Sequence, residues 1–196
     1  MRRSAALAIG VGAAVGAADA TGQGGAALFV RACLDGSPGF DGAADAFADA
    51  GLERKQAGAE AGTGDPDRQV WRRPGTDALA STVAAISALS GPWGQGLACG
   101  VAETVPGALP DAAPPTLAAW GASLTGGEAP ACIGSDGPTR SCRWFGRGDD
   151  HCLRLDWMAT ILPAATGATK RIRHYAFLTT AETTNACAHV ARGGLE

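Results

Sequence analysis

The chain has 196 residues, with 16 Lys and Arg against 19 Asp and Glu, which gives a formal net charge of −3. A mildly acidic chain without a cluster of basic residues is a poor candidate for binding nucleic acid or an anionic membrane surface. The length suits a single domain and is sufficient to bury a hydrophobic core.

The N-terminus has the pattern of a secretory signal peptide. Arg2 and Arg3 form a positive start, residues 5–18 are apolar, and Ala18-Asp19-Ala20 matches a small-residue cleavage site. The apolar run is shorter than the roughly 18–20 residues that span a bilayer, so no membrane insertion is expected after cleavage. The pattern predicts a signal peptide at residues 1–20 and export to the periplasm or the medium.

The exported part is predicted to be one domain, residues 21–196, that contains all the cysteines. An even number of cysteines in an exported chain predicts three disulfides, for which fifteen pairings are possible. Free reactive thiols are therefore not expected. The six cysteines are Cys33, Cys99, Cys132, Cys142, Cys152 and Cys187.

Two short helices are predicted near the start of this domain. Residues 26–34 have helical spacing of apolar side chains, and a second helix is predicted to begin at Ser37-Pro38, with the serine as N-cap. Apolar residues keep helical spacing as far as position 50, and Gly51 is well placed just after the helix end.

The middle of the chain alternates between strand and helix signals. Residues 69–73 and 97–102 are predicted strands, and residues 116–124 are a predicted helix after two prolines. Residues 77–90 are ambiguous, because their apolar stripe is helical whereas their Ser, Thr, Val and Ile content favours a strand; strand is slightly favoured. Residues 126–137 are predicted to be a loop.

Residues 138–180 are the centre of the predicted fold and consist of three consecutive antiparallel strands. Residues 153–161 alternate between an apolar parity that includes Leu155 and Trp157 and a polar parity that includes Arg154 and Asp156. We therefore expect an α+β domain with an antiparallel meander sheet of about five strands. The short N-terminal and middle helices are expected on one face, and disulfides are expected to stabilise the domain.

The first half of the chain resembles uncharacterised small secreted bacterial proteins of the α+β type. The resemblance is carried by Phe29-x-x-x-Cys33, Pro38-x-Phe40, an alanine-rich helix ending at Gly51-Leu52, and the strand cysteine Cys99. It implies a meandering antiparallel sheet and a Cys33–Cys99 disulfide. It implies no activity.

The other four cysteines admit two pairings. Cys132 and Cys142 bracket a short Gly- and Pro-containing loop, and this pair leaves Cys152 with Cys187. Alternatively, Cys142 and Cys152 flank a turn and face each other across a hairpin.

The most charged turn, at residues 147–151, is the one place where catalytic chemistry is conceivable. Asp149, Asp150 and His151 are candidates for metal binding or for acid and base roles. The favoured interpretation is a solvated turn, since Gly and Asp are typical turn residues. No hydrolase motif of the G-x-S-x-G or H-E-x-x-H type is present, and no cofactor or metal is expected.

A basic and aromatic run follows in the last predicted strand. Lys170, Arg171 and Arg173 precede Tyr175 and Phe177, which share one parity. The run is either a ligand-binding face or the wet end of a strand in which arginine stems cover aromatic rings.

These patterns predict an exported, non-catalytic domain with a binding or envelope-assembly role, acting through the sheet face or the 147–151 turn. Its partner, a protein or a small molecule, is not identified by any motif. The alternative is a secreted hydrolase that uses Asp149, Asp150 and His151. That alternative requires these side chains to converge with His174 or a backbone oxyanion site in one pocket.

Overall fold

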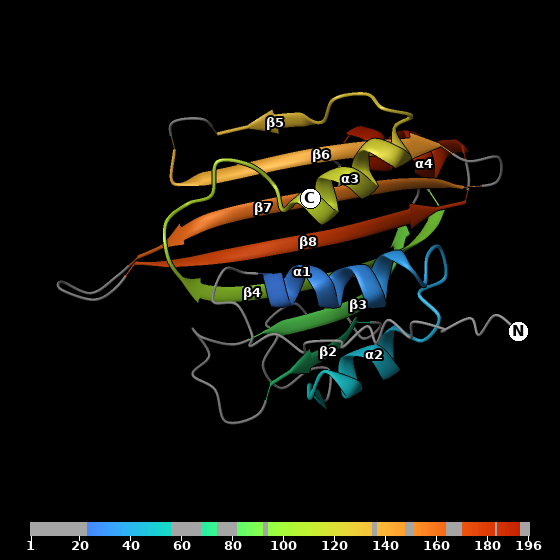
Figure 1. Cartoon of the computed structure of the whole chain (residues 1–196). Coiled ribbons are helices and arrows are strands. Elements are labelled where there is room, and N and C mark those ends of the chain that lie inside the picture. The colour runs from blue at the N-terminus through green and yellow to red at the C-terminus, as the bar shows by residue number, and fades with distance from the viewer. Residues whose placement is uncertain are drawn as a thin grey trace, which may run out of the picture.

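The computed structural model describes residues 23–55, 68–73, 82–91, 94–134, 137–147, 151–163, 170–182 and 184–192. Within them a single antiparallel sheet of eight strands has the order β1-β2-β3-β4-β8-β7-β6-β5 (Figure 1). The strands are β1 (Glu53–Lys55), β2 (Arg68–Arg72), β3 (Val83–Gly91), β4 (Gly94–Pro106), β5 (Ala131–Ile133), β6 (Thr139–Arg147), β7 (Cys152–Leu162) and β8 (Arg171–Ala181). The helices are α1 (Gln23–Phe29), the π-helical segment η1 (Val30–Leu34), α2 (Ala43–Asp49), α3 (Pro115–Leu124) and α4 (Thr184–Arg192).

The sheet consists of two four-stranded meanders joined through their last strands. Strands β1 to β4 pair in sequence order, and β5 to β8 do the same. Strand β8 then pairs with β4 over eleven residue pairs, from Gly96 opposite Ala181 to Pro106 opposite Arg171. The connection from β4 to β5 contains α3 and leads across the sheet to the edge formed by β5 (Figure 1).

The predicted meander of about five strands is therefore wrong. The described part of the chain has eight strands, and the sheet is two meanders and not one. Strands β1 and β5 are three residues long, which is too short to show a period-2 pattern. The β4–β8 contact joins segments about 75 residues apart, and no local pattern reports such a pairing.

The two faces of the sheet have different coverage. Figure 1 shows α1, α2 and α3 on one side of the sheet, here called the covered face, and α4 on the other side, here called the open face. On β7, Leu155, Trp157 and Ala159 point to the covered face and are at most 1% exposed. The predicted alternation of this strand is thus present in the structure. Arg154, however, is also buried, because α4 lies over it.

The N-terminal helices differ from the prediction at one boundary. Helix α1 and η1 together include the predicted helix at 26–34, but α2 begins at Ala43 and not at Pro38. Phe40 and Gly42 have positive φ angles of 59° and 76°, and these conformations cannot continue a right-handed helix. Ser37 and Pro38 lie in the preceding turn. Gly51, with φ 75°, does follow the helix end as predicted.

Elsewhere the helix and strand assignments are mixed. The ambiguous segment contains β3, so strand is correct for residues 83–90, and α3 matches the predicted helix. Strand β5 lies in what was predicted to be a loop. Helix α4 was not predicted.

Three disulfides connect these elements. They join Cys33 to Cys99, Cys132 to Cys142 and Cys152 to Cys187, with Cα–Cα distances of 5.6, 4.1 and 5.7 Å. These are the same pairs as the expected ones, and the alternative Cys142–Cys152 pair is absent. In the β6–β7 hairpin Cys142 pairs with Trp157, whereas Cys152 pairs with Arg147, so the two cysteines lie in different rows and on opposite faces.

Three disulfides are typical of a protein in an oxidising compartment. The predicted signal peptide, residues 1–20, lies outside the described residues. No helix in the described part of the chain is long and apolar enough to cross a membrane.

We predict that removal of the Cys33–Cys99 disulfide destabilises the protein more than removal of the Cys132–Cys142 disulfide. Cys33→Ser/Cys99→Ser opens a 66-residue loop and should lower the free energy of unfolding by about 4 kcal/mol, against about 3 kcal/mol for Cys132→Ser/Cys142→Ser, which opens a loop of 10. Urea unfolding of both double variants measures the difference. A larger loss for the Cys132 pair would contradict this account.

Candidate functional site

The structure separates the residues of the catalytic alternative. His151 is half-buried just before β7, while Asp149 and Asp150 lie outside the described residues. His174 lies opposite Ala159, which is seven residues along β7 from Cys152 at the start of the strand. At 3.3 Å per residue, the start of β7 and the position of His174 are about 23 Å apart along the sheet. His151 and His174 therefore do not converge. No group of three or more His, Cys, Asp or Glu side chains within the described ranges is placed to hold a metal ion.

His174 belongs to a closed polar cluster on the covered face. Glu103 lies opposite it on β4, and the Glu103 carboxylate accepts a hydrogen bond of 2.9 Å from the backbone N–H of Gly25 in α1. His174 Nδ1 and Trp157 Nε1 are both buried without a hydrogen-bond partner among the described residues. The cavity beside them measures about 10 Å³, roughly the volume that one water-sized probe occupies. This cavity is too small to hold a substrate.

Burial lowers the pKa of His174 below its ordinary value, because desolvation disfavours the imidazolium, and the nearby Glu103 carboxylate opposes this effect. Burial therefore favours the neutral form of the imidazole. His174 therefore influences the stability of the protein and the dependence of that stability on pH.

The open face offers a different environment. Side chains directly opposite each other in the register share a face, so one row crosses the six strands from β3 to β5. This row consists of Val83, Ala102, Tyr175, Met158, Ser141 and Ile133. Ile133 is 76% exposed and Phe177, in the next row, is 36% exposed, although both are large hydrophobic residues.

Two aromatic rings lie side by side on the open face along β8. The Tyr175 and Phe177 ring centroids are 6.0 Å apart with an interplanar angle of 17°, and the Arg173 guanidinium lies 5.3 Å from the Tyr175 ring centroid. Phe177 lies against Gly100 of β4, where a Cβ atom would overlap the ring. The Arg173 guanidinium thus covers Tyr175, whereas Phe177 is presented to solvent.

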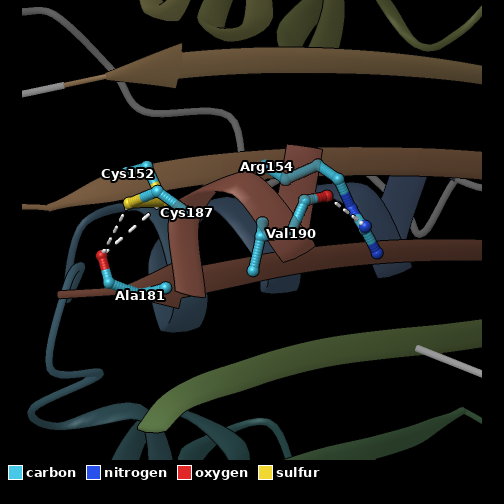
Figure 2. The surroundings of a disulfide bond; sticks show 5 residues. All are labelled: Cys152, Arg154, Ala181, Cys187 and Val190. Atoms are coloured by element: carbon cyan, nitrogen blue, oxygen red, sulfur yellow. Dashed lines mark hydrogen bonds between the residues drawn. A yellow bond between two sulfur atoms is a disulfide. The ribbon is translucent and has the colours of Figure 1, made fainter. Parts of the chain in front are cut away.

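A charged network lies beside the aromatic rings. Asp156 on β7 accepts hydrogen bonds from Arg143 Nε on β6, at 2.7 Å, and from Arg154 Nε, at 2.6 Å. Arg154 also donates to the carbonyl oxygen of Val190 in α4, at 2.6 Å (Figure 2). The Cys152–Cys187 disulfide holds α4 in place above this network.

The network and the apolar residues border one hollow of about 460 Å³. Phe177, Met158 and Ile133 contribute apolar walls, and Arg143, Arg154 and Asp156 contribute charge. The alternation of β7 predicts that Arg154 and Asp156 lie on the face opposite the core, but it does not indicate their contacts with Arg143 and α4. The alternating parity of β7 was the available signal. A second hollow, of about 660 Å³, lies at the β5 edge next to the Arg140–Asp111 ion pair.

Charge is distributed unequally between the faces. At open-face strand positions there are eight basic residues and two acidic ones, Glu53 and Asp156, although the whole chain is acidic. The rest of the chain therefore has eight basic and 17 acidic residues. The basic eight are Lys55, Arg68, Arg72, Arg143, Arg147, Arg154, Arg171 and Arg173. The overall charge conceals this basic face.

Comparison with known proteins adds no assignment: no protein-family model matches the chain, and no curated protein matches it significantly.

We predict that His174 makes the stability of the domain depend on pH. Because its pKa is lower in the folded state, the unfolded chain binds the proton more readily, and the free energy of unfolding should fall as the pH drops below about 6.5. Above that pH the contribution is fully present. Urea unfolding between about pH 5 and pH 8 should show a weaker pH dependence for His174→Gln than for the wild type.

Equal slopes for His174→Gln and the wild type would show that burial of His174 does not influence stability.

We predict that Arg154 is required to hold α4 and Asp156 together. Its side chain is 5% exposed, and Arg154→Met leaves the Val190 carbonyl and one Asp156 oxygen without their donor. A loss of about 2–4 kcal/mol in the free energy of unfolding is expected. Arg147→Met, on the exposed end of β6, should change it by less than about 0.5 kcal/mol. Similar losses in both variants would contradict the role of Arg154.

Proposed function

We propose that this protein is an exported, non-catalytic binding domain and that it binds its partner through the open face of the sheet. The observation that supports this most directly is the hollow beside the exposed Phe177 and Ile133, on a face where α4 is the one helix of the described residues (Figure 1). Contiguous exposed apolar residues rimmed by charges are typical of interaction sites. The basic excess of the same face would attract an anionic partner.

Export is supported by the three disulfides and by the leader pattern at residues 1–20. We propose that cleavage follows Ala20 and that the domain acts in the periplasm or outside the cell. The resemblance to small secreted bacterial proteins is part of the same proposal.

The hydrolase alternative has less support. His174 lies on the covered face, seven residue positions along the sheet from the start of β7, and does not meet His151. A binding role needs only the surface that the described residues form.

We predict that a charge in place of Phe177 abolishes binding. Immobilised wild-type protein and the variant Phe177→Asp are incubated with extract of the cell envelope, and bound material is quantified by mass spectrometry. The amount of specifically bound material should be at least about tenfold lower for the variant than for the wild type, as expected when a central aromatic contact is lost.

Ala119→Asp is the matched control, because Ala119 is exposed on α3 on the covered side of the sheet. It should bind like the wild type. Equal retention by wild type and Phe177→Asp, or loss of retention in Ala119→Asp, would place the binding surface elsewhere.

A further inference from the structure

We infer that the open-face hollow binds a small amphiphilic carboxylate, whose carboxylate group pairs with Arg143 and whose apolar part lies against Phe177, Met158 and Ile133. This inference rests on the proposed binding function and names the class of ligand. The ligand is a soluble molecule with one acidic group and an aliphatic or aromatic body.

The charge balance of the hollow favours an anion. Both oxygens of Asp156 already accept hydrogen bonds, one from Arg143 Nε and one from Arg154 Nε. Two guanidinium groups therefore face a single carboxylate, and one positive charge remains uncompensated within this network. An additional carboxylate would neutralise it, whereas a cation would be repelled.

Arg143 has the free donors that such a group needs. Its Nε is engaged by Asp156, but its two terminal amino groups have no hydrogen-bond partner among the described residues, and its side chain is 42% exposed. The end of a guanidinium group forms two parallel hydrogen bonds with a carboxylate. Asp156 holds the Arg143 side chain from the Nε edge and leaves that end available.

Arg154 positions this arrangement and does not itself need to contact the ligand. It is fixed by Asp156 on one side and by the Val190 carbonyl on the other, under α4. Its guanidinium group orients Asp156, and Asp156 in turn orients Arg143. A binding group held in place before the ligand arrives loses less conformational entropy on binding.

The walls of the hollow fit an apolar body of limited size. A volume of about 460 Å³ lies within the range of about 300–1,000 Å³ that is usual for small-molecule sites. Phe177 lies against Gly100 of β4, and Met158 has an adaptable side chain suited to irregular ligands. The Cys132–Cys142 disulfide pins β5, which carries Ile133 on the far wall.

The arrangement of the lining favours a free amphiphilic acid as the occupant. The lining residues come from the five strands β4 to β8, and the charged side chains Arg143, Arg154 and Asp156 lie among the apolar ones. A single molecule with one acidic group and an apolar part can therefore contact both kinds of side chain.

The test uses three probes of equal chain length, decanoate, decanol and decylamine, titrated below their micellar concentrations into the exported chain and followed by calorimetry. Decanoate should bind with a stoichiometry of one and at least about tenfold more tightly than decanol, because a charged hydrogen-bonded pair is added. Decylamine should bind more weakly than decanol, because its charge meets the excess positive charge.

Variants at two arginines of β6 localise the effect. Arg143→Gln should weaken decanoate binding at least about tenfold, and Arg143→Lys should also weaken it, because it keeps the charge and loses the two-donor end. Arg147→Gln removes an exposed arginine on the same strand and face, outside the lining, and should stay within about twofold of the wild type. Thermal unfolding shows whether each variant is folded. If Arg143→Gln does not fold, the comparison is made with Arg143→Lys.

Three outcomes would overturn the inference: equal binding of decanoate and decanol, equal losses in the Arg143 and Arg147 variants, or binding to anionic lipid vesicles without binding of free decanoate. If decanoate fails to bind while Phe177→Asp still abolishes retention of envelope material, the ligand class is wrong and the open face remains the binding surface. If decanoate binds as described but Phe177→Asp retains envelope material normally, the proposed function is wrong instead.

Discussion

The pairing of β4 with β8 is the interaction on which the rest of the structure depends. Each meander alone would be a four-stranded sheet with an exposed edge at its longest strand, and the eleven-residue ladder removes both edges. The ladder also sets the two faces. Cys99 on the covered face of β4 holds the N-terminal helical segment through Cys33, and the small residues Ala98, Gly100 and Ala102 on its open face leave room for the β8 aromatic rings.

The segregation of charge follows from this arrangement. Helices α1, α2 and α3 bury the apolar parity of the long strands, so the other parity carries the arginines. Burying one of these, Arg154, would be costly if it were unpaired, and the structure satisfies it with Asp156 and with the Val190 carbonyl. Helix α4 therefore closes one end of the open face and organises its charged centre. Among the helices of the described residues, only α4 lies over this face.

Local patterns predicted the local features of this fold. The alternation in residues 153–161, the position of Gly51 after α2 and the helix at 116–124 each depend on residues within one element. The short strands β1 and β5 and the helix α4 were missed, because their formation depends on the strands against which they pack. Arg154 was expected to be in water for the same reason. The hollow was unpredictable in detail, since its walls come from β5, β6, β7 and β8, whose register the sequence pattern does not specify.

The most direct test of the open face as a binding surface uses Met158, the single methionine of residues 21–196. A chain labelled with ¹³C at the methionine methyl group should show one such resonance, from a side chain in the middle of the open face. Material that the wild-type protein retains from envelope extract should shift or broaden this resonance in proportion to the amount added. A resonance that stays unchanged at saturation would show that binding occurs elsewhere and would contradict the account.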